Sequence, residues 1–79
     1  MIIPLKKLFE YDNFKIRINN LTVWIEWHEW MNKTNFINRV MEVIEEFEEM
    51  PIEMNYNKDG VELTYLIVGG INDNGIELY

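Results

Sequence analysis

Residues 14–27, FKIRINNLTVWIEW, alternate between apolar and polar side chains on both sides of an Asn-Asn pair. Alternation of this kind is typical of half-buried β-strands, and asparagine tolerates the positive φ angles of a two-residue turn. The segment therefore predicts a β-hairpin that turns at residues 19–20. Its register pairs Ile18 with Leu21, Ile16 with Val23 and Phe14 with Ile25, and all six share one core face with Trp27.

Residues 33–50 predict the main helix, because apolar side chains recur there every three or four positions. Asn32 or Thr34 is placed to cap its start, and Pro51 is expected to close its end. The expected buried positions are Phe36, Ile37, Val40, Val43, Ile44, Phe47 and Met50. The opposite face carries an acidic stripe, defined as Glu42, Glu45, Glu46 and Glu49.

Shorter patterns fill the rest of the chain. Residues 4–11, PLKKLFEY, predict a short helix with Pro4 in its first turn. Residues 51–68 predict a second hairpin that turns at residues 57–60, and Asn74-Gly75 is a strong turn dipeptide before a final strand. The second hairpin places Ile52, Met54, Tyr56, Val61, Leu63 and Tyr65 on one face.

The expected fold class is α+β, with a single small domain over residues 1–79. An antiparallel sheet of four to five strands in the order ββαβββ would carry one main α-helix on one face, with the short helix at the N-terminus.

The segment LTVWIEWHEW, residues 21–30, holds all three tryptophans and the only histidine. The spacing of three between Trp24, Trp27 and Trp30 would also suit a helix, but the alternating β-branched residues around them favour a strand. In a strand, Trp27 joins the core face. The outward face then carries Lys15, Arg17, Trp24, His28 and Trp30, with Lys15 opposite Trp24 and placed for a cation–π contact.

Composition limits the classes of protein that this chain can represent. Hydrophobic residues make up 48% of the sequence, which is ample for a packed core. There is no cysteine, which excludes disulfides and thiolate zinc sites, and the start of the chain lacks the pattern of a signal peptide. A cytoplasmic location is expected. The absence of Ala, Ser and Gln beside abundant Ile, Glu and Asn indicates coding in an AT-rich genome, such as that of a low-GC bacterium or its phage.

Charge is distributed unevenly along the chain, whose net charge is −7. Residues 1–40 hold six Lys or Arg against four acids, whereas residues 41–79 hold one Lys against ten acids. Glutamates three and four positions apart on a helix repel each other, and near its C-terminus they oppose the helix dipole. The acidic stripe breaks both rules, which points to a contact surface for a basic partner. The alternative is a solvated face that only aids solubility.

The outward face of the first hairpin leaves two further alternatives open. The N-terminal segment could fold over its aromatic side chains and make a second small core, or they could anchor a partner. Lys15, Arg17, Trp24, His28 and Trp30 could also form a stacking platform for single-stranded nucleic acid. Two cations are few for phosphate-driven binding, and the net charge opposes it.

Signals for catalysis are weak. His28 has no Ser or Cys nucleophile to activate, and HEWMN lacks the second histidine of a zincin helix. Residues 55–66 space Asn55, Asn57, Asp59 and Gly60 like a calcium loop, but Leu66 stands where the bidentate Glu is needed. We therefore expect no catalytic residue, no metal ligand and no cofactor, and we expect that the protein is not an enzyme.

The function that these patterns indicate best is an acidic protein-binding module of the inhibitor or immunity type, such as a phage or mobile-element anti-defence protein (an anti-CRISPR or DNA mimic). Its partner would be a protein with a basic surface, such as a nuclease or a defence complex, and a homodimer is left open. No nucleic-acid or membrane partner is expected. The alternative is a small single-stranded nucleic-acid-binding protein that uses the first hairpin. The expected partner-binding residues are Glu42, Glu45, Glu46, Glu49, Trp24, His28 and Trp30.

Overall fold

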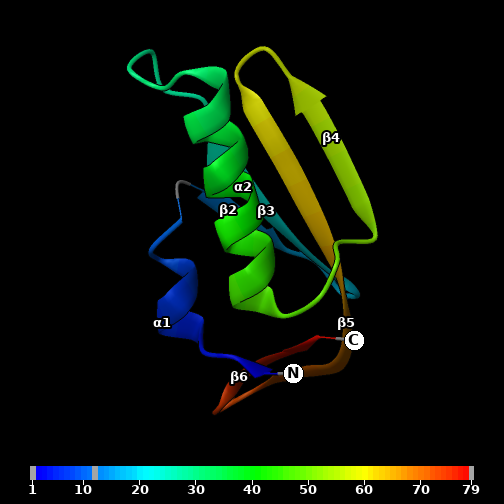
Figure 1. Ribbon diagram of the computed structural model, residues 1–79. Coiled ribbons are helices and arrows are strands. Elements are labelled where there is room, and N and C mark those ends of the chain that lie inside the picture. Colours follow the sequence, from blue (N-terminus) through cyan, green and yellow to red (C-terminus); the bar gives the residue numbers. More distant parts are fainter. Residues whose placement is uncertain (1, 12, 79) are drawn as a thin grey trace.

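The computed structural model describes residues 2–11 and 13–78 (Figure 1). The element order is β1 (Ile2–Ile3), α1 (Leu5–Leu8), β2 (Asn13–Ile16), β3 (Asn20–Glu26), α2 (Lys33–Phe47), β4 (Glu53–Asn57), β5 (Gly60–Asn72) and β6 (Gly75–Leu78). Within these residues the strands form one six-stranded antiparallel sheet in the order β1-β6-β5-β3-β2, with β4 also paired to β5. The predicted α+β class is confirmed, and β1 is a strand that the sequence pattern did not predict.

The long strand β5 organises the sheet, because different partners pair with its two halves. Its first half lies between β3 and β4, and its second half pairs with β6. The register shifts between Ile67 and Ile71, where Gly70 adopts a φ of +73°. A positive φ favours glycine, so Gly70 allows this irregularity at low conformational cost.

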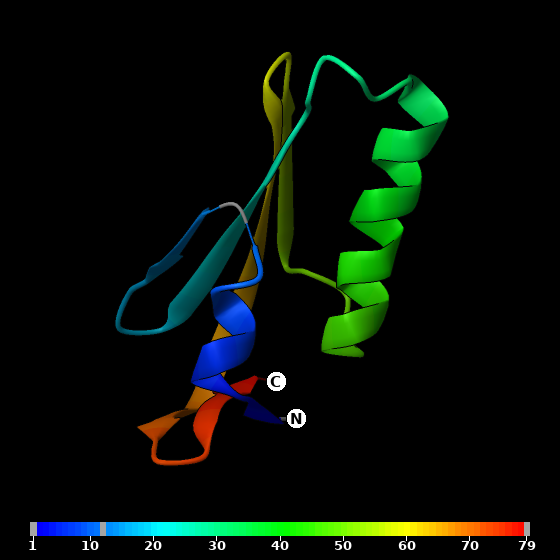
Figure 2. The same ribbon diagram turned by 90° about the vertical axis from the view of Figure 1, so that its left-hand side faces the viewer.

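Helix α2 lies across one face of the sheet, which we call the covered face (Figures 1 and 2). Its buried side chains are Phe36, Val40, Val43, Ile44 and Phe47. They belong to one hydrophobic cluster with the alternate residues of β3 and β5, whose members are Leu21, Val23, Ile25, Val61, Leu63 and Tyr65. The Phe47 ring packs edge-on against Tyr65 at 4.6 Å and against Tyr11 at 5.5 Å. The core therefore lies between the sheet and the two helices.

The first hairpin is present, but its predicted register is wrong by two residues. Phe14 pairs with Val23 and Ile16 with Leu21, so the connection spans residues 17–19 instead of the expected two-residue turn. A shift of two preserves the face on which each side chain lies, because side chains alternate with a period of two. Ile18 is the exception: it lies in the connection and is 94% exposed, not in the core.

Trp27 was predicted to lie in the core, and this is also wrong. Strand β3 ends at Glu26, so the alternation no longer determines the direction of the next side chain. Trp27 instead stacks on Phe36 of α2, with ring centroids 4.6 Å apart, and remains 36% exposed. Its indole Nε1 donates a hydrogen bond to the Met31 carbonyl oxygen at 3.2 Å. Trp27 thus fastens the β3–α2 connection to the start of the helix.

Helix α2 begins as predicted and ends earlier than predicted. The Asn32 side chain accepts a hydrogen bond from the Asn35 backbone N–H at 2.8 Å, which confirms it as the N-cap. The helix stops at Phe47 because Glu48 adopts a left-handed conformation with φ of 56°, before Pro51 is reached. The predicted burial of Ile37 and Met50 is wrong, since both are exposed.

The second hairpin pairs Met54 with Leu63 and Tyr56 with Val61, which confirms the face predicted for these four residues. Tyr56 is nevertheless exposed, and Ile52, which precedes β4, is exposed as well. Its turn is closed by the Asn57 side chain, which accepts a hydrogen bond from the Asp59 N–H at 2.7 Å. The final strand β6 follows an equivalent asparagine turn and is confirmed.

The N-terminal segment packs on the same side of the sheet as α2. Leu8 and Tyr11 are buried in the core cluster, and the Phe9 ring contacts Phe14 edge-on at 5.6 Å. This arrangement removes the alternative in which the N-terminal segment covers the outward face of the first hairpin. No helix within residues 2–11 and 13–78 is long and apolar enough to cross a membrane.

Candidate functional site

The acidic stripe does not form one continuous row. Glu42, Glu45 and Glu46 lie on α2 and line a shallow hollow of about 330 Å³. Glu49 lies beyond the helix end and is partly buried, and its charge is close enough to help raise the pKa of Tyr65. Glu49 was predicted to be part of the stripe because the helix was expected to continue for three residues beyond Phe47, to residue 50.

One glutamate of the stripe, Glu46, has partners from elsewhere in the fold. The Tyr11 hydroxyl donates a hydrogen bond to Glu46 Oε2 at 2.6 Å, and Lys7 Nζ lies 3.8 Å from the same oxygen. Burial raises the pKa of Tyr11, and its hydrogen bond to Glu46 raises it further. The pKa of Lys7 is also raised, first by its hydrogen bond with Glu10. These contacts fix Glu46 against α1.

The remaining stripe is more exposed. Glu42 forms an ion pair with Arg39, 3.6 Å from Oε2 to Nη1, and its side chain is 64% exposed. Glu45 is exposed, and its backbone carbonyl accepts a hydrogen bond from the Glu48 N–H at 3.0 Å. The last turn of α2 contains no Lys or Arg to balance the dipole. The exposed negative charge is therefore concentrated on the C-terminal half of α2.

Apolar side chains continue this surface toward the start of the helix. Ile37 is 46% exposed and Met41 is 48% exposed. At 100° per residue, Met41 and Glu45 are neighbours on the helix surface, one turn apart. We call the exposed side of the helix its outward face, made up of Ile37, Asn38, Met41, Glu42 and Glu45. Figure 2 shows α2 at the edge of the molecule, with the sheet on one side of it only.

His28 and Trp30 lie in the connection between β3 and α2, not on a strand. Their rings stack in parallel, with centroids 5.6 Å apart and an interplanar angle of 4°. Trp30 is 73% exposed. The two residues therefore form a small aromatic projection near the N-terminal end of α2, apart from the exposed glutamates at its C-terminal half.

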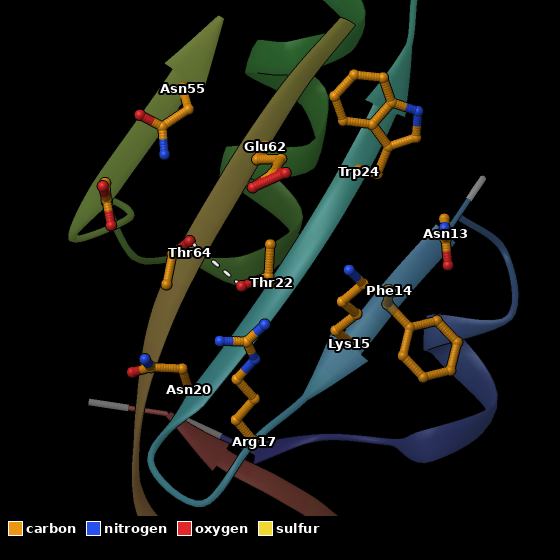
Figure 3. A pocket seen from close by; sticks show the side chains of 11 residues that line it. Asn13, Phe14, Lys15, Arg17, Asn20, Thr22, Trp24, Asn55, Glu62 and Thr64 are labelled. Carbon is orange, nitrogen blue, oxygen red and sulfur yellow. Dashed lines mark hydrogen bonds between the residues drawn. The ribbon is translucent and has the colours of Figure 1, made fainter.

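Trp24 lies in a third place, on the sheet face opposite α2, which we call the open face. The close-up in Figure 3 shows side chains from β2, β3, β5 and β4 on this face. They surround a hollow of about 370 Å³. Its lining comprises Asn13, Phe14, Lys15, Arg17, Asn20, Thr22, Trp24, Glu53, Asn55, Glu62 and Thr64.

The strand registers arrange most of these side chains in two rows across the sheet. One row consists of Asn13, Trp24, Glu62 and Asn55, because each is the cross-strand partner of the next. The second row consists of Lys15, Thr22, Thr64 and Glu53, by the same pairings. The two threonine hydroxyls in its centre are hydrogen-bonded at 3.3 Å, which Figure 3 marks with a dashed line.

Trp24 faces Asn13 across the strand pair, so the predicted placement opposite Lys15 is wrong by the same two-residue shift. Its ring packs against the backbone of Gly60. A Cβ built on Gly60 would clash with the Ile25 carbonyl oxygen and would lie 2.8 Å and 2.9 Å from two atoms of the indole, so only glycine fits. The fold thereby fixes the indole on the open face.

The structure therefore separates the seven predicted site residues. Three glutamates lie on α2, Glu49 lies beyond it, His28 and Trp30 lie before it, and Trp24 lies on the other side of the sheet. Sequence reasoning missed the polar residues that β4 and β5 add around Trp24, namely Glu53, Asn55, Glu62 and Thr64. The alternating pattern predicted that these four residues lie on an outward face. It did not predict that β5 pairs with β3, which brings them beside Trp24.

Within the described residues, no group of three or more His, Asp or Glu side chains is arranged to hold a metal ion. No family model, curated protein or solved structure matches this chain.

Proposed function

We propose that this protein is an acidic protein-binding module, of the inhibitor or immunity type, that occupies a basic surface of a partner protein. It makes this contact through the outward face of α2. The observation that carries the proposal is the combination on one exposed helix surface of the charged Glu42 and Glu45 with the apolar Ile37 and Met41.

The charges of this surface are unfavourable for the isolated protein. Each like-charge pair three or four residues apart destabilises a helix by a few tenths of a kcal/mol, roughly. Anions near the helix C-terminus oppose the dipole by about 0.3–1 kcal/mol. Glu48 adds a left-handed conformation that costs a non-glycine residue about 1–2 kcal/mol. A partner with a basic surface would offset the first two of these terms.

The apolar neighbours favour a protein as the partner. Interfaces combine a desolvated apolar centre with charges at the rim, and methionine and aromatic residues are enriched in them. Met41 and Ile37 supply such a centre beside Glu45, and Trp30 is exposed near the start of the same helix. The charges would steer the encounter with a basic surface and define its orientation.

The single-stranded nucleic-acid alternative is less well supported. It relied on Lys15, Arg17 and Trp24, which do lie together on the open face. Glu53 and Glu62 line the same hollow, however, and their carboxylates balance the two cations. Phosphate binding needs an excess of positive charge, and this face offers none. His28 and Trp30 lie elsewhere and add nothing to such a platform.

The test is a quantitative pull-down from the native cell, with the full chain as bait and mass spectrometry as the readout. Glu42→Lys with Glu45→Lys should lose the specific partner. The control is Asp59→Lys with Asp73→Lys, which changes net charge equally at two exposed hairpin turns. It should retain the partner.

Binding is then measured with the purified partner by isothermal titration calorimetry at low and high salt. An affinity that both double variants lose equally would mean that only net charge matters, and the proposal would fail. Unchanged binding of Glu42→Lys with Glu45→Lys would also contradict it. Circular dichroism of both variants establishes that each is folded.

A further inference from the structure

The open face of the sheet is a second surface, independent of the one proposed for the protein partner. It lies on the opposite side of β3 and β5 from α2, so one surface can be changed without touching the other. Its hollow of about 370 Å³ is within the range of small-molecule sites, which is roughly 300–1,000 Å³.

The charged side chains that line the hollow balance, although the chain as a whole is strongly acidic. Two cations, Lys15 and Arg17, approach the hollow from β2 and the connection that follows it. Two carboxylates, Glu53 and Glu62, approach it from β4 and β5. Neither an anion nor a cation would meet a field of one sign here, so electrostatics favour a polar ligand without net charge.

The polar groups of this face suit a ligand whose own groups both donate and accept hydrogen bonds. Asparagine amides and threonine hydroxyls offer both functions, while the cations only donate and the carboxylates only accept. The face presents Asn13, Asn20, Asn55, Thr22 and Thr64 among these four charged groups. Sugar hydroxyls are both donors and acceptors, and several project from each ring.

Trp24 supplies a large apolar surface in the hollow, beside the ring of Phe14. Its ring is held against Gly60 and is partly exposed. Flat indole rings pack well against the apolar C–H face of a pyranose, while their surroundings hydrogen-bond the hydroxyls at the ring edge. Glu62 and Asn13 stand on either side of Trp24 in the same row, and Asn55 follows Glu62.

We propose that the open face binds an uncharged saccharide, with one sugar ring stacked on Trp24 and its hydroxyls hydrogen-bonded by Glu62, Asn55 and Lys15. The hydrogen-bonded Thr22–Thr64 pair lies at the centre of the neighbouring row. This ligand class follows from the balanced charge and the mixed donors and acceptors around a single indole.

The experiment is an NMR titration of the ¹⁵N-labelled full chain with four neutral disaccharides: maltose, cellobiose, lactose and N,N′-diacetylchitobiose. Adenosine monophosphate and the dipeptide Lys-Asp serve as charged probes. At least one disaccharide should give saturable shifts of the Thr22, Trp24 and Glu62 amides and of the Trp24 indole N–H. The Trp30 indole N–H should not move.

Trp24→Ala should weaken this binding about three- to tenfold, the range expected for losing one stacked ring. Asn55→Ala is a second variant at an exposed position, so it should keep the fold and still weaken binding. The matched control is Trp30→Ala, which removes an exposed tryptophan outside the hollow and should leave affinity unchanged.

Several outcomes would overturn the proposal. The first is no saturable shift with any disaccharide, and the second is shifts that map to α2. The third is saturable binding of only adenosine monophosphate or Lys-Asp, which would assign the hollow to a charged ligand. None of these results would affect the pull-down that tests the acidic surface of α2.

Discussion

The two faces of the β3–β5 pair differ in polarity and burial, although the side chains of both come alternately from the same two strands. On the covered face, Leu21, Val23 and Leu63 are fully buried. On the open face, Thr22, Trp24 and Glu62 surround a polar hollow. Because side chains alternate between faces with a period of two, each strand can serve stability and binding at once. Substitutions on the open face are therefore free to change binding while the core remains intact.

The two proposed binding surfaces also differ from each other. The outward face of α2 concentrates negative charge beside apolar side chains, whereas the hollow of the open face is lined by equal numbers of cations and carboxylates around one indole. A surface with charge of one sign suits a large partner of opposite charge, and a balanced hollow suits a small neutral ligand.

Substitutions at two neighbouring residues of β5 should differ most in their effect on the free energy of unfolding. Leu63→Ala should lower the free energy of unfolding by about 2–5 kcal/mol, because it empties a fully buried site under α2. Glu62→Ala, one residue earlier on the open face, should change it by less than about 0.5 kcal/mol. Urea denaturation measures both. Equal losses would mean that the open face is also part of the core.

The buried tyrosines of the covered side should make the stability of the protein depend on pH. Burial raises the pKa of Tyr65 and of Tyr11 above their ordinary value of 10.0. A tyrosine that holds its proton more tightly when folded stabilises the protein fully below pH 10.0 and loses that contribution as pH rises above it. Stability should therefore fall above pH 10.0, by up to about 1.4 kcal/mol per pH unit for each tyrosine.

Urea midpoints measured at about pH 9 and about pH 11 test this dependence. Tyr65→Phe should reduce the loss. It should also stabilise the protein slightly at neutral pH, since the Tyr65 hydroxyl is buried without a hydrogen-bond partner among the described residues. The control variant is Tyr56→Phe on the exposed end of β4, which should keep the wild-type midpoint at neutral pH. A Tyr65→Phe variant with an undiminished loss at high pH would contradict this explanation.

The smallest expected effect is at the end of α2. Glu48→Gly should raise the free energy of unfolding by about 1 kcal/mol, because glycine adopts the left-handed conformation without strain and relieves the helix dipole of one anion. Glu45→Gly, three residues earlier inside the helix, should instead be destabilising by roughly 0.5–1 kcal/mol. Thermal unfolding distinguishes the two. If both substitutions changed stability in the same direction, α2 would not end at Phe47 as described.

The sequence pattern predicted the sheet face on which each side chain lies better than it predicted which residues pair across neighbouring strands. Alternation assigned Leu21, Val23 and Leu63 to the core correctly, and a register error of two residues in the first hairpin left those faces unchanged. Sequence periodicity failed to predict the position of side chains that lie just beyond the end of a strand or helix. Trp27 and Glu49 were assigned by extending a period beyond Glu26 and Phe47, where the backbone changes direction.

Long-range pairing could not be predicted from local pattern. Strand β1 has only two residues, too few to show a period, and it exists because it pairs with β6. The hollow of the open face requires β5 to lie between β3 and β4, which brings Asn55 and Glu62 beside Trp24. Likewise, the contact of Glu46 with Tyr11 joins residues that are 35 positions apart.

The central claim is that a protein partner contacts the outward face of α2 and leaves the open face free. It is tested most directly by recording ¹⁵N–¹H NMR spectra of the labelled full chain with and without the purified partner from the pull-down. We expect the amide signals of Met41, Glu42 and Glu45 to shift or broaden, while those of Thr22, Glu62 and Asn55 keep their positions. Perturbation of the open face with unchanged α2 signals would contradict it.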